Sequence, residues 1–201
     1  MKIRRPNDAS RHPRAQLPGH RKGDPFIRRV LWGLLGRHIC RFSFHNWYAL
    51  RRLVLAAFGA EIHPSAKIRR TARIDCPWNL TMGELSALGD HATITARAPV
   101  RVGSSCTLSQ HTKIFTQAHD PLDPDFQIYT APVTIQDDAW IAADVVVMPG
   151  VTIGEGVVVG ARSFVDRSLR PWQIAAGEPA TERRKRPFMG RQGAETEPVA
   201  A

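Results

Sequence analysis

Aliphatic residues return at every sixth position along most of this chain. The stripe runs through Ile62, Ile68, Ile74 and Leu80, continues after short slips through Leu88, Ile94, Val100, Val102, Leu108 and Ile114, and then extends from Ile135 to Val165. Six residues rotate an α-helix by about 600°, which leaves such a stripe about 120° out of register. Short strands joined by tight corners keep it on one side, and three six-residue units complete one coil. The pattern therefore predicts an all-β fold, a parallel β-helix with an aliphatic interior.

The repeat is interrupted at the stretch FTQAHDPLDPDF, residues 115–126. Pro121, Pro124 and Pro132 follow the break, and proline cannot donate a hydrogen bond to a neighbouring strand. Residues 120–132 are therefore expected to leave the coil as an extruded loop, with His119 where it begins.

Residues 25–60 follow helical spacing instead. One segment groups Val30, Leu31, Leu34 and Leu35 on a single side with arginines around them, and a second runs from Trp47 to Phe58. Two interpretations stay open: helices packed on the β-helix or on a partner subunit, and a basic anchor at a lipid surface. The remaining boundaries are a flexible basic arm at 1–24, the β-helix at 61–180, and a C-terminal tail at 181–201 that is first basic and then flexible.

Composition narrows the class of protein. The 201 residues are 43% apolar, which is typical of a globular domain, and the net charge of +10 gathers near the two ends of the chain. No interleaved aromatics or recognised module accompany that charge, so we expect no nucleic-acid partner. Three cysteines without a CxxC motif, and apolar runs shorter than the ~20 residues of a membrane span, favour a cytoplasmic protein. A peripheral contact with the inner face of the plasma membrane through the helices remains open.

Five stretches go beyond the general repeat: RRLVLAAFGAEI (51–62), PWNLTMGELSALGD (77–90), LSQHTKIFTQAHD (108–120), AWIAADVVVMPGVTIGEGVVVGARSFV (139–165) and PWQIAAGEPA (171–180). They resemble the hexapeptide-repeat acyltransferases, closest to the colanic-acid and other exopolysaccharide O-acetyltransferases. The resemblance covers about residues 26–186. It implies a left-handed coil, a homotrimer, and acetyl transfer from acetyl-CoA to a saccharide hydroxyl in the precursor of a bacterial surface polysaccharide. A trimer also suits a narrow prism, which has too little concavity to hold two substrates alone.

The resemblance assigns His119 the role of general base. An imidazole, with an ordinary pKa of about 6.5, takes a proton from a hydroxyl at neutral pH and returns it to the leaving thiolate. The family implies direct transfer without an acyl-enzyme. Asp120 either orients the ring or makes an N-cap or Asx-turn. His111 is the rival base, and both histidines also admit a purely structural interpretation.

Three histidines in such a coil also raise the zinc site of the gamma-type carbonic anhydrases. The spacing of His91, His111 and His119 does not match that family's ligands, so no metal is expected.

The resemblance places the pantetheine arm of acetyl-CoA along the C-terminal coils, between adjacent subunits. The matching residues are Trp140, Ala142, Ala143, Gly160 and Ala161. Glycine is common where Ala142 stands, and the exopolysaccharide subgroup also has alanine there. Small residues let the arm approach backbone donors, although coil corners need small residues for structural reasons too.

Cations near the end of the chain suit the phosphates of CoA. The pair Asp166-Arg167 stands where the family has Thr-Lys, so Arg167 keeps the positive charge while Asp166 weakens the match. Arg184, within the basic run 183–186, adds charge beyond the last coil. A solvated basic tail is the alternative.

The acceptor is less well defined. His91, Gln110, His111 and Arg97 are candidates for binding it. Where maltose- and galactoside-type enzymes carry Asn and Asp to hold the sugar, this chain has Gly89 and Arg97, so the sugar is held differently. Arg97, Arg101 and the basic helices would suit an anionic or lipid-diphosphate-linked glycan.

Two other functions stay open. One is acetylation of a small amine or an amino acid such as serine, and the other is a non-catalytic β-helix scaffold. His119, the loop and the GEPA segment favour an enzyme over a scaffold.

Overall fold

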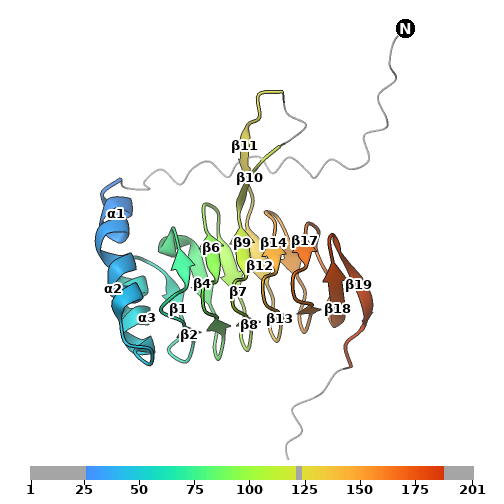
Figure 1. Ribbon diagram of the computed structural model, residues 1–201, viewed down its shortest axis with the longest axis horizontal. Helices are drawn as coiled ribbons and strands as arrows, with labels where there is room; N and C mark the ends of the chain where they lie inside the picture. Colours follow the sequence, from blue (N-terminus) through green and yellow to red (C-terminus); the bar gives the residue numbers. More distant parts are fainter. Residues whose placement is uncertain (1–25, 121–123, 188–201) are drawn as a thin grey trace, which may run out of the picture.

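The computed structural model describes residues 26–120 and 124–187, and the expected arm at 1–24 lies outside that range. Figure 1 shows a three-sided β-solenoid with helices at its N-terminal end and a hairpin that projects from one edge. The parallel β-helix predicted from the six-residue repeat is confirmed.

Each side of the solenoid is a sheet whose solenoid strands run parallel. Sheet A contains β1 (Glu61–Ile62), β4 (Leu80–Met82), β7 (Val100–Val102), β12 (Val133–Ile135) and β15 (Thr152–Ile153). Sheet B contains β2 (Lys67–Ile68), β5 (Ala87–Leu88), β8 (Thr107–Leu108), β13 (Trp140–Ile141), β16 (Val158–Val159), β18 (Gln173–Gly177) and β19 (Ala180–Lys185). Sheet C contains β3 (Arg73–Ile74), β6 (Thr93–Thr95), β9 (Lys113–Phe115), β14 (Val146–Val147) and β17 (Phe164–Val165). The chain passes through sheets A, B and C in turn, so the solenoid has three edges, named A–B, B–C and C–A after the sheets that meet there.

The aliphatic stripe fills the interior as expected. Ile94, Leu108, Ile141 and Val159 are each at most 1% exposed, and they share one hydrophobic cluster with the other stripe residues. Ile62, at the open end of the first coil, is only partly buried. Every coil therefore contributes apolar side chains to a single continuous core.

The three edges differ in backbone geometry. Corners on the A–B and B–C edges contain non-glycine residues with positive φ between 55° and 61°: Leu85, His91, Ser105, His111, Asp138, Asp144, Arg162 and Trp172. That left-handed conformation costs roughly 1–2 kcal/mol for an ordinary residue, so the stacked ladder must hold these corners in place. His91 and His111 thus occupy equivalent corners of successive coils.

The slips in the repeat all fall on the C–A edge. Ile62 pairs with Met82 twenty residues later, whereas Ile135 pairs with Ile153 eighteen residues later. In the first coil the additional residues form the 3₁₀ turn η2 (Pro77–Asn79), and in the second they lie within 96–99. The third coil inserts the antiparallel hairpin of β10 (Gln117–His119) and β11 (Ile128–Thr130) at the same edge. The excursion therefore begins at Gln117, ahead of the expected start at 120.

Helices cover the first coil. A continuous helical segment consists of α1 (Phe26–Leu31), the π-helical turn η1 (Trp32–Gly36) and α2 (Arg37–Phe42), and α3 (Tyr48–Ala57) follows. Trp32 and Leu55 are buried against the solenoid, and the indole of Trp32 donates to the carbonyl of Ile74 at 2.9 Å. Gly59, with φ of +89°, ends the last helix.

Arg51 fastens this helical layer to the first coil. Its side chain is fully buried, and its Nε donates to the carbonyl of Ile68 at 2.7 Å. Its two Nη atoms donate to the hydroxyl of Ser43 and to the carbonyls of Phe44 and His45 at 2.7–2.8 Å. One guanidinium therefore fixes both α3 and the preceding turn.

The expected tail from 181 requires a correction. β19 continues to Lys185 as an antiparallel partner of β18, so Arg183 and Arg184 lie in a strand at the end of sheet B. Arg186 donates to the carbonyls of Asp138 and Gly156 at 3.0 and 2.9 Å. The basic run therefore closes the solenoid, because its backbone pairs with the last coil; residues 188–201 lie outside the described range.

Candidate active site

The hairpin presents His119 with a defined tautomer. Its Nδ1 lies 2.7 Å from the carbonyl oxygen of Phe126, and the two rings stack at 4.6 Å with an interplanar angle of 14°. A carbonyl only accepts hydrogen bonds, so Nδ1 carries the proton and donates it. The lone pair of the neutral ring is then on Nε2. His119 is exposed, and no residue of the described ranges hydrogen-bonds that nitrogen, which is therefore available as a base.

Phe126 therefore has the orienting role that the sequence suggested for Asp120. The backbone N–H of Asp120 donates to the carbonyl of Gln127 at 3.2 Å, which extends the hairpin pairing by one residue. The carboxylate of Asp120 and burial together raise the pKa of Tyr129, with burial the larger cause. A role for Asp120 in the chemistry stays a proposal.

The small residues that the resemblance assigns to cofactor binding lie along the B–C edge. They form two groups that differ in their backbone hydrogen bonds. The backbone N–H groups of Ala142 and Gly160 donate to the carbonyls of Val159 and Ala175 at 3.0 and 2.8 Å. Within the described ranges, no acceptor faces the N–H groups of Ala143 and Ala161. Only this second pair has donors to offer a ligand.

Gly160 also has a structural reason to be glycine, because a Cβ there would lie 3.0 Å from the Cβ of Ala176. The corner residues Ala142 and Gly160 thus belong to the architecture of the coil more than to a binding surface.

Trp140 provides an apolar wall beside these donors. It lies on the outer surface of sheet B with 49% of its surface exposed, and its Nε1 donates to the hydroxyl of Ser109 at 3.1 Å. Ser109 fixes the plane of the indole, a contact that the repeat pattern alone did not reveal.

A hollow of about 590 Å³ lies on sheet B near the same edge, and Gln110 and His111 line it. The rings of His91 and His111 stack at 5.1 Å with an interplanar angle of 8°. Three of the four acceptor candidates therefore gather around one corner of the second and third coils.

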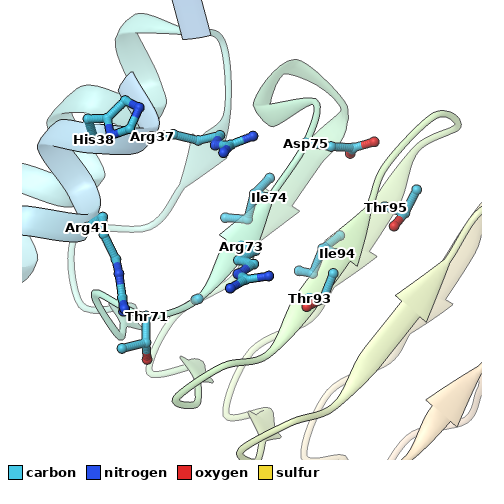
Figure 2. A pocket seen from close by; sticks show the side chains of 11 residues that line it. Arg37, His38, Arg41, Thr71, Arg73, Ile74, Asp75, Thr93, Ile94 and Thr95 are labelled. Atoms are coloured by element: carbon cyan, nitrogen blue, oxygen red, sulfur yellow. The ribbon is translucent and has the colours of Figure 1, made fainter. Parts of the chain in front are cut away.

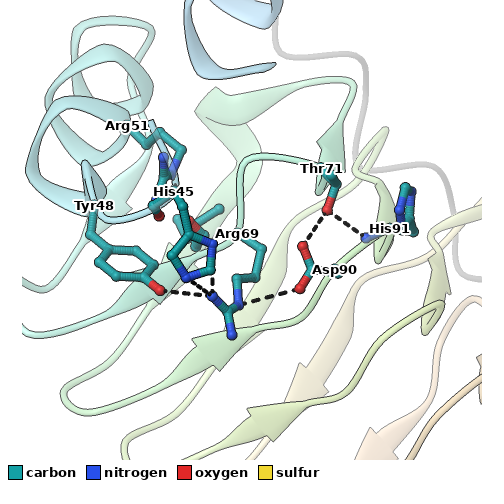
Figure 3. Close-up of polar contacts among 8 residues, drawn as sticks. His45, Tyr48, Arg51, Arg69, Thr71, Asp90 and His91 are labelled. Carbon is teal, nitrogen blue, oxygen red and sulfur yellow. Dashed lines mark hydrogen bonds and ion pairs between the residues drawn. The ribbon is translucent and has the colours of Figure 1, made fainter. Parts of the chain in front are cut away.

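Arg69 is one of the residues that line that hollow, and Figure 3 shows its polar contacts. Its Nη1 contacts the Nε2 of His45 at 2.8 Å and donates to the hydroxyl of Tyr48 at 3.1 Å, and its Nε lies 3.4 Å from the carboxylate of Asp90. Thr71 donates to the same carboxylate at 2.7 Å. Arg69 occupies the same corner position in the repeat as Gly89 and Ser109 of the next two coils, and the packing of the helices over the first coil brings His45 and Tyr48 to it.

The remaining candidates do not join this group. Arg97 lies on the C–A edge, where its Nε is 3.1 Å from the carboxylate of Asp75. Arg167 lies on that edge too and pairs with Asp166 at 3.0 Å, which raises the pKa of Arg167. Arg184 is on β19, at the end of sheet B.

The predicted site is thus divided between two edges of the prism. His119, Arg97 and Arg167 belong to the C–A edge, whereas the cofactor donors and the stacked histidines belong to the B–C edge, with sheet C between them. Among the residues that the structure describes, no group of three or more His, Cys, Asp or Glu side chains is arranged to hold a metal ion. The helices of the described ranges also include none that is long and apolar enough to cross a bilayer.

Comparisons with known proteins agree with this architecture. The family model "Bacterial transferase hexapeptide (six repeats)" matches residues 132–167. The colanic acid biosynthesis acetyltransferase candidate WcaF of Escherichia coli is 35% identical over 170 residues, which cover 85% of this chain and 93% of that protein. The galactoside O-acetyltransferase of Escherichia coli is 37% identical over 90 residues, 45% of this chain and 43% of that protein.

Solved structures show the same fold. A hexapeptide-repeat acetyltransferase from Vibrio cholerae bound to acetyl-CoA has a TM-score of 0.72 at 24% identity, covering 79% of this chain and 87% of its own. A galactoside acetyltransferase bound to coenzyme A has a TM-score of 0.73 at 24% identity, covering 82% and 84%. With the length and identity of the match to WcaF, the solenoid and its extruded hairpin show that this chain belongs to the left-handed β-helix, hexapeptide-repeat acetyltransferases.

Proposed function

We propose that this protein transfers the acetyl group of acetyl-CoA directly to a hydroxyl of a saccharide, with His119 as general base. The observation that carries the proposal is the bond from Nδ1 of His119 to the carbonyl of Phe126, which leaves Nε2 unprotonated on an exposed ring. Similarity to WcaF and to a galactoside O-acetyltransferase supports a saccharide acceptor, as in the precursor of a bacterial surface polysaccharide.

The chemistry follows from that tautomer. Nε2 takes the proton of the acceptor hydroxyl as its oxygen bonds to the carbonyl carbon of the thioester. The tetrahedral intermediate then expels CoA as the C–S bond breaks, and the imidazolium returns the proton to the leaving sulfur. The free N–H of Ala143 or Ala161 is the donor that we assign to the oxyanion.

Direct transfer fits the state of the cysteines. Burial raises the pKa of Cys40 and of Cys106 to about 11, so both stay protonated at neutral pH. Cys76 is 3% exposed and points into the core cluster. A thiol must be a thiolate to act as a nucleophile, so these side chains do not support an acyl-enzyme.

A homotrimer would complete the site. One chain holds the base and the cofactor donors on different edges, and a neighbouring copy can place its B–C edge against the C–A edge of the first. The hairpin has an apolar surface suited to that contact: Phe126, Ile128 and Tyr129 are 59%, 50% and 38% exposed.

We also infer a cytoplasmic protein that contacts the membrane surface through its helices. Eleven of the sixteen exposed large hydrophobic residues of the described ranges fall between Phe26 and Leu53. Residues 26–60 contain six arginines, all at least partly exposed except the buried Arg51, and no acidic residue. Apolar side chains among cations suit the surface of an anionic bilayer.

The test is acetyl transfer to a panel of saccharides, with serine and small amines as alternative acceptors and the free thiol of CoA as readout. His119→Ala should lower turnover by roughly 10²–10⁴-fold with little change in the affinity for CoA. His63→Ala, at an exposed histidine on the A–B edge of the first coil, is the matched control and should retain most of the turnover, whereas His111→Ala tests the rival base. Near-full turnover in His119→Ala would remove this residue from the mechanism, and failure to bind acetyl-CoA would favour a scaffold.

A further inference from the structure

A cationic hollow lies between α2 and the first two strands of sheet C, apart from the residues assigned above. It has a volume of about 360 Å³ and is lined by Arg37, His38, Arg41 and Arg73, with threonines on the sheet side. Figure 2 shows the side chain of Arg37 extending from α2 towards the sheet and Arg73 on β3 facing the same space. Helix and sheet thus direct positive charge into one space.

Among residues 26–120 and 124–187, the arginines of this hollow have no partner that offsets their charge. In the part of the chain that the structure describes, no carboxylate or other acceptor contacts the guanidinium of Arg37, Arg41 or Arg73. The one carboxylate of the lining, Asp75, pairs with Arg97 at 3.1 Å and accepts the N–H of Ala96 at 2.6 Å. Three like charges beside a carboxylate that already has partners favour the binding of an anion.

The side chains that line the hollow are suited to binding phosphate. Guanidinium groups bind phosphate oxygens through paired, charge-assisted hydrogen bonds. The hydroxyls of Thr93 and Thr95 project on the outer surface of β6 and add neutral donors. The volume is large enough for more than one phosphate, which suits a diphosphate beside the three arginines.

Position relates the hollow to the hairpin. The hairpin leaves the coil directly after β9, the strand that pairs with β6, so its root lies about 5 Å from the far wall of the hollow, one strand spacing away. Thr116, at that root, donates to the carbonyl of Thr95, a lining residue, at 2.7 Å. An anion in the hollow would therefore lie close to the edge that presents His119.

We propose that this hollow binds the diphosphate of a phosphorylated acceptor, such as a saccharide linked through diphosphate to an apolar chain. The assignment of the anion to the acceptor rests on the proposed function, whereas diphosphate binding itself does not. Leu34 and Phe42, 66% and 79% exposed on the same helical segment, offer an apolar surface for the chain.

The experiment measures calorimetric binding of inorganic diphosphate to the full-length protein without acetyl-CoA. Arg73→Gln and Arg41→Gln should each weaken binding by about tenfold or more, the loss expected when a charged hydrogen bond is removed. Arg170→Gln is the matched control, since this exposed arginine lies in the last coil, where it pairs with Glu182 outside the hollow, and should bind like the wild type. Equal losses in Arg73→Gln and Arg170→Gln, or no binding by the wild type, would overturn the site.

Two further measurements separate the sources of phosphate and the two proposals. Vesicles of phosphatidylcholine with or without phosphatidylglycerol test the bilayer: if Arg73→Gln loses only vesicle binding, the arginines serve the membrane and the diphosphate site is wrong. In turnover, Arg73→Gln should raise the KM for a prenyl-diphosphate-linked saccharide and leave that for the unphosphorylated saccharide unchanged. A protein that binds diphosphate yet transfers no acetyl group would refute the transferase alone, and the reverse result would refute the hollow alone.

Discussion

Replacing Arg51 tests how the helical layer is held to the solenoid. Arg51→Met removes four hydrogen bonds of 2.7–2.8 Å from a fully buried side chain. Three backbone carbonyls then lose a charged donor, and each unsatisfied buried acceptor costs about 1–3 kcal/mol. Two of these carbonyls belong to the turn at Phe44 and His45, where water can return. We therefore expect a loss of about 3–5 kcal/mol in the free energy of unfolding.

Urea unfolding followed by tryptophan fluorescence measures this loss at a fixed protein concentration. Arg52→Met is the matched control, because the neighbouring Arg52 makes one bond of 3.0 Å to the carbonyl of Ala66 and should cost about 1 kcal/mol or less. Arg51→Lys keeps the charge but loses the planar set of donors, so its loss in the free energy of unfolding should lie between those of Arg51→Met and Arg52→Met. If Arg51→Met unfolded within about 1 kcal/mol of Arg52→Met, the carbonyl contacts would not hold the layer in place.

Four further outcomes are expected. Trp140→Ala should raise the KM for acetyl-CoA with a smaller change in kcat, measured by initial rates, because it removes the wall beside the pantetheine donors. Burial raises the pKa of Cys106 from 9.0 to about 11. The stability that the neutral thiol contributes is therefore present below pH 9 and is lost as the pH rises towards 11. The urea midpoints of wild type and Cys106→Ala should converge over that range. Leu34→Glu should weaken co-sedimentation with anionic vesicles, unlike Lys67→Glu on sheet B. Deletion of residues 1–24 should leave turnover intact, and a large loss would place the arm in the site.

The six-residue stripe was sufficient to predict the solenoid because each coil buries its own aliphatic residues. Ile68, Ile141 and Val159 occupy equivalent interior positions for that reason. The sequence does not explain the slips in the repeat. Residues 77–79 and 96–99 look like ordinary turns, and only the strand register shows that both lie on one edge.

From sequence the basic run 183–186 is expected to be a tail, because four consecutive cations show no apolar alternation that would indicate the backbone pairing of β19. Contacts within the site were equally hidden. His119 was identifiable from its position at the break, but the carbonyl that sets its tautomer comes from Phe126, across the hairpin. The separation of the cofactor residues from His119 follows from which edge each corner occupies, and a linear repeat does not show this.

The hairpin is tied to the coil at a narrow neck. The N–H of Ala131 donates to the carbonyl of Thr116 at 2.9 Å, and β9 and β12 on either side keep their own partners in the stack. The same edge is closed in the next coil by the short connection between β14 and β15. The hairpin is thus attached at a single point, so lengthening, shortening or replacing it would leave the strand pairing of the solenoid unchanged. On the proposed function, changes in the hairpin that keep His119 and Phe126 would alter the choice of acceptor and leave the B–C edge, proposed to bind acetyl-CoA, unchanged.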